Sequence, residues 1–336
     1  MSLIAGLVLI PVLAAYILTG WVRRYALSRL LDVPNARSSH SRPTPRGGGL
    51  AIVIVLAVAT LAGVWFGFLP SRLSLALLAC VPLAVVGFVD DHGHVPARWR
   101  FLLQMLAATW VVILFGGVEH LVVAGRTLTL GLAGYPLGVL FLVWYLNLFN
   151  FMDGIDGIEG VEVTFVALSA SMFMACRGAF FSPESLVLVA VSGATLGFLI
   201  WNWPPARIFM GDVGSGVLGF LLALITINSA TNGTLSLCVW IILAGVFLVD
   251  ATQTLMVRLV RGERWYEAHR SHAYQHASRR FGSHRAVTLG ILAVDVFWLL
   301  PLAMAAVAWP EYEHLLTVLA LAPLSYVAYR LGAGSP

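Results

Sequence analysis

The sequence "GVLFLVWYLNLFNFMDGIDGIEGVEVTFVALSASMFMAC", residues 138–176, places a short acidic stretch between two apolar runs. The acidic stretch, residues 147–160, holds Asp153, Asp156 and Glu159. The runs on either side have the length and apolar character of membrane-spanning helices. This pattern predicts two membrane-spanning helices joined by an acidic turn at one membrane face.

The composition extends this prediction to the whole chain. Hydrophobic residues make up 60% of the 336 residues and charged residues only 11%, whereas a soluble domain carries about 25% charged residues. We therefore expect an all-α polytopic membrane protein in which residues 1–336 form a single domain. Its apolar runs predict about eleven transmembrane helices, at 3–21, 49–69, 73–89, 101–117, 134–150, 161–177, 185–203, 213–230, 234–257, 286–308 and 313–331.

The distribution of arginine predicts the orientation. All 20 basic residues are arginine. If the N-terminus lies outside, only Arg72, Arg126 and Arg177 fall on the outer side, and the other seventeen fall on the inner side. Cytoplasmic loops are enriched in basic residues, so we expect the N-terminus outside and the C-terminus inside. The net charge of +4 then needs no nucleic acid to explain it.

With this topology, five segments lie on the inner face, and together they gather most of the chain's polar chemistry. Among their aspartates, Asp90, Asp91, Asp153, Asp156 and Asp212 all fall near this one membrane face. The five segments are residues 22–48, 90–100, 147–160, 202–216 and 258–285.

The motif "GFVDD" ends the third predicted span with the adjacent carboxylates Asp90 and Asp91. Beside a charged substrate, such a pair could supply a general base, although it could also simply mark the end of a helix. In the acidic stretch, Asn147, Asn150 and Asp153 are spaced three apart, which would make Asn150 and Asp153 neighbours on a helix. Amide and carboxylate oxygens suit Mg²⁺, and a plain acidic turn is the alternative.

The motif "IFMGDVGSG" places Asp212 where a helix is expected to begin. Backbone N–H groups at such a terminus favour phosphate, and Asp212 could hold a metal ion that bridges it. Alternatively, Asp212 is an N-cap. Phe209 could stack on a nucleobase or be an ordinary interfacial aromatic residue.

The segment "EAHRSHAYQHASRR" would place His269, His272 and His276 on one face if it were helical throughout. Its histidines and arginines could neutralise a diphosphate, or the helix could lie on anionic lipid. The first inner segment, with Arg37 and His40, has the same two interpretations. Together, the five segments provide the groups needed for phosphoryl transfer to a membrane-bound acceptor.

In these motifs the chain resembles the polyprenyl-phosphate N-acetylhexosamine-1-phosphate transferase family. The resemblance covers nearly the whole chain and is carried by five motifs in the family's order. They are "DVPNARSSHSRPTPRGGG", "GFVDD", "NLFNFMDGIDG", "FMGDVGS" and the histidine-rich last inner segment.

The resemblance implies a helical membrane fold of about eleven spans and a Mg²⁺ cofactor, with Mn²⁺ as an alternative. It implies transfer of a sugar 1-phosphate from a UDP-N-acetylhexosamine to undecaprenyl phosphate, with release of UMP. Such a reaction starts a surface polysaccharide of the O-antigen kind at the bacterial inner membrane, with the active site facing the cytoplasm. A homodimer is compatible with the resemblance.

The resemblance also assigns residues. Asp90 and Asp91 match the acidic pair in which one carboxylate deprotonates the acceptor phosphate, and Asp153 is a third catalytic candidate. Asn150 and Asp212 match the metal-site positions. The substrate-binding candidates are Asn147, Asp156, Phe209, Arg37, His40, His272 and His276.

The spread histidines of "HRSHAYQH" depart from the compact run of the peptidoglycan branch, and this favours a UDP-N-acetylhexosamine donor, including deoxy sugars. The competing hypotheses are a phospho-N-acetylmuramoyl-pentapeptide transferase and a secondary transporter that uses the intramembrane acids Asp250 and Asp295.

Overall fold

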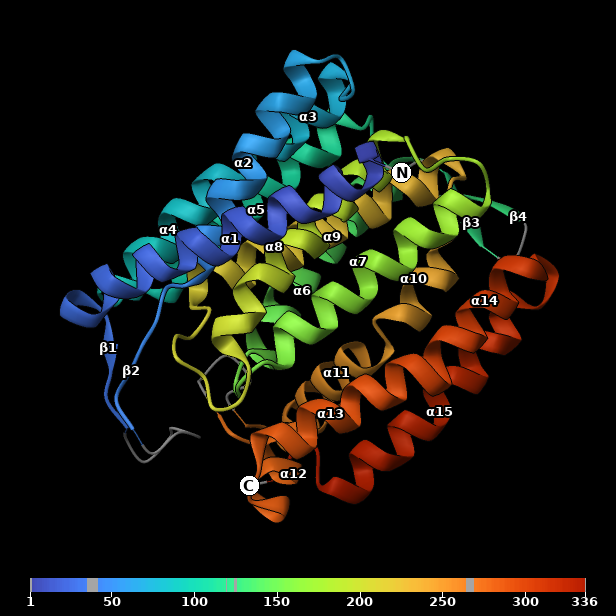
Figure 1. Ribbon diagram of the computed structural model, residues 1–336. Helices are drawn as coiled ribbons and strands as arrows, with labels where there is room; N and C mark the ends of the chain where they lie inside the picture. The colour runs from blue at the N-terminus through green and yellow to red at the C-terminus, as the bar shows by residue number, and fades with distance from the viewer. Residues whose placement is uncertain (1, 35–41, 119, 124–125, 264–268, 336) are drawn as a thin grey trace.

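Helices make up most of the computed structural model, which describes residues 2–34, 42–118, 120–123, 126–263 and 269–335 (Figure 1). Nine of its helices are long and apolar enough to cross a membrane within these described residues. The prediction of an all-α polytopic membrane protein is therefore confirmed.

The first half of the chain forms the helices that lead to the acidic stretch. They are α1 (Ser2–Arg29), α2 (Gly49–Trp65), α3 (Ser71–Leu77), α4 (Cys80–His92), α5 (Ala97–Leu114), the 3₁₀ turn η1 (Gly131–Ala133) and α6 (Gly134–Met152). The second predicted span is short, because α2 has only 17 residues. The third predicted span corresponds to α3 followed directly by α4, which together form one candidate span, Ser71–His92.

The second half begins with the most buried helices. They are α7 (Ile158–Cys176), α8 (Pro183–Asn202) and α9 (Asp212–Asn232). The remaining elements are α10 (Leu237–Leu243), α11 (Gly245–Val260), α12 (Ala273–Phe281), α13 (His284–Val294), the π-helical segment η2 (Asp295–Leu299), α14 (Leu300–Ala308), the 3₁₀ turn η3 (Pro310–Tyr312) and α15 (Glu313–Leu331).

The ninth predicted span, residues 234–257, is broken. Helices α10 and α11 meet at Ala244 with a bend of 82°. Hydropathy reads this segment as one span because both halves are apolar. The break instead sends α11 away from the direction of α10, and the C-terminal helices α11 to α15 form a layer on one side of the bundle (Figure 1).

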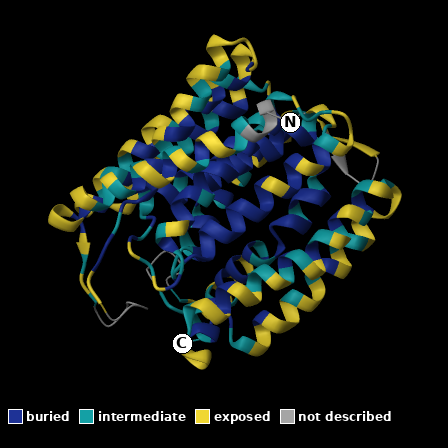
Figure 2. Cartoon of the chain, viewed as in Figure 1, coloured by how far each residue is buried: buried dark blue, intermediate teal, exposed yellow. Residues whose placement is uncertain are grey.

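Burial divides the helices into a core and a lipid-facing shell. Within the 18-residue apolar stretch of α9, 89% of the residues are buried inside the protein. In the corresponding stretch of the span that contains α15, only 11% are buried (Figure 2). Small residues let the core helices approach closely, as is usual between membrane helices. A Cβ on Gly197 of α8, for example, would collide with the backbone of α1 at Val12.

Two short strand pairs lie at opposite ends of the bundle (Figure 1). Strands β1 (Leu31–Asp32) and β2 (Thr44–Pro45) are antiparallel, with Leu31 opposite Pro45. Strands β3 (His120–Val123) and β4 (Arg126–Thr129) are also antiparallel, with His120 opposite Thr129. The ends of α4 and α6 and the start of α9 lie at the β1–β2 end, where the candidate site is found.

Candidate active site

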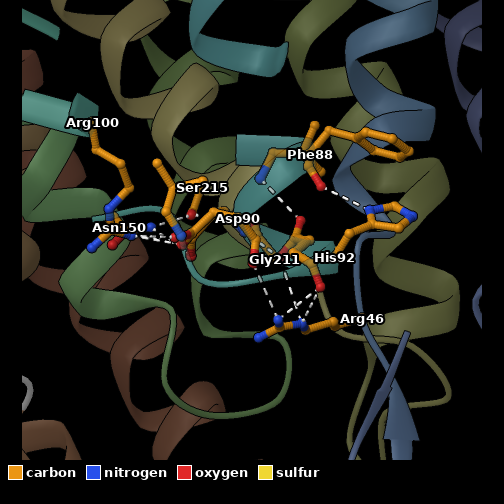
Figure 3. A network of polar contacts seen from close by, with 12 residues as sticks. Arg46, Phe88, Asp90, His92, Arg100, Asn150, Gly211 and Ser215 are labelled. Carbon is orange, nitrogen blue, oxygen red and sulfur yellow. Dashed lines mark hydrogen bonds and ion pairs between the residues drawn. The ribbon is translucent and has the colours of Figure 1, made fainter. Parts of the chain in front are cut away.

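The acidic pair lies at the end of α4, where Arg46 binds it. The Arg46 guanidinium donates to the Asp91 carbonyl at 2.7 Å and 3.1 Å and to the Asp90 carbonyl at 3.3 Å (Figure 3). The last carbonyls of a helix lack partners within the helix. Arg46 therefore satisfies the C-terminus of α4 and fixes the first inner segment against it.

Asp91 points away from solvent and caps α9. One of its carboxylate oxygens accepts from the backbone N–H of Asp212 at 3.1 Å, and the other accepts from that of Val213 at 3.3 Å. Gly211, with φ of 77°, precedes them, and a Cβ there would collide with the Asp91 carboxylate. A glycine is therefore required at this position.

This geometry corrects both interpretations of the start of α9. Asp212 is not the N-cap, because Gly211 occupies that position. The N-terminal N–H groups are also not open to a phosphate. Asp91 accepts two of them, and the carbonyl of Gly211 accepts the next two, from Gly214 and Ser215.

Arg100 joins Asp90 to Asp212. Its guanidinium lies 2.8 Å from the Asp90 carboxylate and 2.8 Å from that of Asp212 (Figure 3). The second oxygen of Asp90 accepts from the backbone N–H of Val95 at 2.7 Å. The side chain of Asp91 is only 2% exposed, whereas the side chains of Asp90 and Asp212 are 13% and 34% exposed. Asp90 and Asp212 are thus the accessible carboxylates of the group.

Asn150 completes this group from α6. Its amide donates to Asp212 at 3.2 Å and to the hydroxyl of Ser215 at 2.8 Å. Asn147, one turn earlier, donates instead to Gln104 at 2.9 Å and to the carbonyl of Val143 at 2.7 Å. The structure therefore places Asn150 beside Asp212, as expected for a shared site, and uses Asn147 to join α6 to α5.

Asp153 lies just after α6, in a partly buried position near the other acids. Burial is the main cause that raises its pKa to about 7, and the negative charges of Asp212, Asp91 and Asp156 act in the same direction. Asp153 therefore changes protonation near neutral pH, which suits a group that exchanges protons.

Asp156 holds the 202–216 segment in place. Its carboxylate accepts from the backbone N–H of Ala206 at 3.0 Å and lies 3.3 Å from His284 at the start of α13. Phe209, in the same segment, pairs with the first inner segment through its backbone, which bonds to Pro45 at 2.8 Å and Gly48 at 2.9 Å. Asp156 and Phe209 thus lie on the segments that border the acidic group.

The predicted histidine helix is wrong in its extent. Helix α12 begins at Ala273, so His272 is its N-cap and His269 precedes the helix. The rings of His269 and His272 nevertheless stack, with centroids 4.9 Å apart. Burial, His272 and Arg258 lower the pKa of His269 to about 4.

His276 is on α12, where its ring nitrogens lie 2.9 Å from Arg279 and 3.3 Å from the carbonyl of Ser335. Burial and then Arg279 lower its pKa. Its contacts are therefore with the C-terminal tail. Arg37 and His40 lie outside the described residues.

Helix α12 is fixed over the acidic stretch by Asp250 and Tyr274. The Asp250 carboxylate, on α11, accepts from the backbone N–H groups of Ala273 and Tyr274 at 2.8 Å each. The Tyr274 hydroxyl then donates to the carbonyl of Phe151 at 3.0 Å. Gly154 has no room for a side chain because a Cβ would collide with that hydroxyl. The glycine at this position therefore leaves room for the Tyr274 hydroxyl.

Sequence reasoning missed three residues of this site. Arg46 and Arg100 were counted as evidence for orientation, and Arg46 also among the basic groups of the first inner segment, but neither was expected to bind the aspartates. Glu159 was noted as acidic without a role. It is fully buried, and within the described residues neither of its carboxylate oxygens has a hydrogen-bond partner. Only the tertiary structure brings these three to the aspartates.

The oxygen atoms of Asp212, Asp90 and Asn150 are hard ligands of the kind that Mg²⁺ takes. Within the described residues, no three His, Cys, Asp or Glu side chains are grouped so that they could hold a metal ion. Mg²⁺ commonly binds through one or two carboxylates and completes its shell with waters and substrate phosphates. The donor set therefore fits a cation that is shared with a phosphorylated substrate.

A multi-pass helical membrane protein with such an acidic group at one end is the class that fold and site define. Residues 73–230 match the sequence model of glycosyl transferase family 4. The chain is 31% identical over 296 residues to a probable undecaprenyl-phosphate N-acetylglucosaminyl 1-phosphate transferase of Bacillus subtilis, covering 85% of this chain and 80% of the relative.

A decaprenyl-phosphate N-acetylglucosaminephosphotransferase of Mycolicibacterium smegmatis is 31% identical, over 74% of this chain and 68% of the relative. A phospho-N-acetylmuramoyl-pentapeptide-transferase of Bacillus velezensis is 30% identical, over 74% and 79%. The chain belongs to glycosyl transferase family 4.

Proposed function

We propose that this protein transfers a sugar 1-phosphate from a UDP-N-acetylhexosamine to undecaprenyl phosphate and releases UMP. The observation that supports this most strongly is the group formed by Asp90, Asp212, Asn150 and Arg100 at one end of a membrane bundle. Acidic and basic groups meet there at the ends of the apolar helices α4 and α6 and at the start of α9. Two of the relatives are named for N-acetylglucosamine phosphate transfer to a polyprenyl phosphate.

In the proposed reaction, an oxygen of the prenyl phosphate attacks the phosphorus that carries the sugar. The bond from that phosphorus to the bridging oxygen of UDP breaks, and UMP leaves. Asp90 is the proposed base that takes the proton of the acceptor phosphate, because it is more exposed than Asp91 and its carboxylate is not used to cap a helix. Asp91 positions α9 and thereby Asp212.

Asp212 and Asn150 would hold Mg²⁺ together with the donor diphosphate. When bound, the ion would offset the charge that builds up on the transferred phosphate. The Arg100 guanidinium pairs with both Asp90 and Asp212, at 2.8 Å each. When the donor binds, this guanidinium can exchange its bonds with the carboxylates for bonds with the diphosphate, because arginine binds phosphate and carboxylate with the same two-pronged geometry. Asp153, with a pKa of about 7, is a proposed second proton acceptor.

The proposal also covers the identity of the UDP-sugar donor. We favour a UDP-N-acetylhexosamine, including deoxy sugars, because the histidines are spread along the chain and because only His276 lies on α12. The product would start a surface polysaccharide at the bacterial inner membrane, with the site facing the cytoplasm. The similarity to a phospho-N-acetylmuramoyl-pentapeptide-transferase makes UDP-N-acetylmuramoyl-pentapeptide the second candidate donor.

One of the two residues on which the transporter hypothesis rests has another explanation. Asp250, one of its two intramembrane acids, caps α12 through two backbone hydrogen bonds and so has a structural task.

A lipid-product assay tests the proposal. Purified protein in detergent would receive undecaprenyl phosphate, Mg²⁺ and one labelled donor at a time: UDP-N-acetylglucosamine, UDP-N-acetylgalactosamine, a UDP-N-acetylated deoxyhexose or UDP-N-acetylmuramoyl-pentapeptide. We expect labelled lipid diphosphate from a UDP-N-acetylhexosamine and none when the acceptor is left out. Product from the pentapeptide donor alone would overturn the donor assignment, and no lipid product with any donor would overturn the reaction.

A further inference from the structure

Two acidic side chains face each other inside the membrane bundle, apart from the candidate active site. Glu162 is on α7, about one turn from its start, and Asp295 begins the π-helical segment η2. Both are 0% exposed. Their carboxyl groups lie against each other closely enough to share a hydrogen bond.

Other groups do not satisfy this pair. Within the described residues, none of the four carboxyl oxygens receives a well-formed hydrogen bond from an N–H or O–H group. The hydroxyl of Tyr145, on α6, is also buried without a partner and lies within electrostatic reach of Glu162. The backbone N–H of Phe247 faces Glu162 from the first turn of α11, just after the break between α10 and α11.

Electrostatics determine what such a pair can hold. Ionised carboxylates only accept hydrogen bonds, so two of them cannot bond to each other. An isolated charge in an apolar interior is very costly, and two like charges in contact add repulsion. The two groups therefore need a positive ligand between them. No third His, Cys, Asp or Glu joins them in the described chain, and Mg²⁺ or Ca²⁺ would need six or more oxygens. A proton needs only the two that are present.

We propose that Glu162 and Asp295 form a proton-binding site within the membrane, in which the two carboxyl groups share a proton. The surrounding groups agree with this assignment. Tyr145 can donate to whichever carboxyl accepts, and the N–H of Phe247 at the positive end of α11 favours residual negative charge on Glu162. The site also joins α7 of the core to η2 of the C-terminal layer. The bound proton therefore holds these two parts of the bundle together.

Infrared difference spectroscopy of the full-length protein in detergent tests this site. A protonated carboxyl has a carbonyl band that an ionised carboxylate lacks. We expect such a band at neutral pH in the wild type and a shift of this band in Glu162→Gln and in Asp295→Asn, because the remaining buried carboxyl keeps a proton but loses its carboxyl partner. The band should be lost when both residues are replaced by amides. Both amides keep the side-chain shape and can hydrogen-bond to the remaining carboxyl, so both variants should fold.

Glu184 provides a matched control. It is also a buried carboxylate in a membrane helix, but it accepts hydrogen bonds from Asn228 at 2.6 Å and Asn232 at 2.8 Å. Because its carboxylate already receives two amide hydrogen bonds and faces no second carboxyl group, Glu184→Gln should remove no protonated-carboxyl band. If an amide variant fails to fold, the double replacement Glu162→Met with Asp295→Leu removes both carboxyls together, and the band must again be lost.

A second measurement separates a proton from a small cation. Thermal unfolding of the wild type would be followed in sodium, potassium and choline chloride at equal ionic strength. The proposal expects the same unfolding temperature in all three salts. Stabilisation by sodium or potassium that disappears in Glu162→Gln would overturn the proton in favour of a cation. An unchanged carbonyl band in both amide variants would overturn the site itself.

Discussion

Asp90 and Asp91 are neighbours in the chain, but their carboxylates have different surroundings. Asp91 is buried and accepts the first two N–H groups of α9, while Asp90 is partly exposed and bonds to Arg100. The carboxylate of a capping residue stabilises the helix that it caps. Substitutions of the two residues should therefore affect different properties of the protein.

We predict that Asp91→Ala lowers the free energy of unfolding by about 0.5–2 kcal/mol, the usual cost of a lost helix cap. Asp90→Asn should leave thermal unfolding nearly unchanged but abolish most transfer activity, because it removes the proposed base. Thermal unfolding in detergent and lipid-product formation measure the two effects. Equal loss of stability in both variants would contradict the division of roles.

Asp153 gives a prediction about pH. Its pKa in the folded protein, about 7, lies above its ordinary value of 3.8. The folded protein therefore binds this proton more tightly than the unfolded chain, and the resulting stabilisation is present below the unfolded value and lost as pH rises through about 7. Asp153→Asn should make the unfolding temperature fall less between about pH 5 and about pH 8.

Glu311, exposed in η3, is the control for this titration. Glu311→Gln should leave the pH dependence of unfolding as it is in the wild type. A wild-type slope in Asp153→Asn would show that Asp153 does not hold the proton.

At the scale of elements, α12 is the part that connects the C-terminal layer to the acidic stretch. Asp250 fixes its N-terminus, and the Tyr274 hydroxyl reaches the carbonyl of Phe151 at the end of α6. Asp153 follows two residues later. A small displacement of α12 should therefore move the end of α6, and with it the proton acceptor that we assign to Asp153.

We predict that Tyr274→Phe lowers the free energy of unfolding by about 0.5–1.5 kcal/mol, as for one lost hydrogen bond. It should also lower turnover by a larger factor than a control variant that loses a similar bond far from the site. Tyr326→Phe is the matched control. It also removes one tyrosine hydroxyl bond, from Arg330 at 2.7 Å, but on exposed α15. Thermal unfolding and turnover at saturating donor separate the effects. Equal turnover in the two variants would mean that α12 does not position the site.

The broken span and the histidine segment show where sequence reasoning stops. Hydropathy is a local property, so it located the helices, but residues 234–257 stay apolar across the bend at Ala244 and read as one span. The histidine segment has helical spacing from His269 onward, yet α12 begins only at Ala273 because Asp250, from another helix, accepts its first N–H groups. Such a partner cannot be seen in a local pattern.

At the scale of the whole molecule, the helices place residues that are far apart in sequence into one group. Asp90 lies in the last turn of α4, Asn150 lies in the last turn of α6 and Asp212 begins α9, and all three meet at the β1–β2 end. The sequence predicted their meeting at one face from topology. The tasks of Asp91, Arg46 and Arg100 depend on contacts between helices, and only the three-dimensional arrangement shows them.

The central claim is that this end of the bundle performs phosphoryl transfer from a UDP-sugar to a lipid phosphate. The most direct measurement is UMP release by purified protein with UDP-N-acetylglucosamine, undecaprenyl phosphate and Mg²⁺, comparing wild type with Asp212→Asn. We predict release that requires both the acceptor and the cation and that falls by at least about a hundredfold in the variant, a typical effect of losing an electrostatic group at a reacting centre. Unchanged release by Asp212→Asn, or release that does not depend on the lipid acceptor, would contradict the assignment of the site.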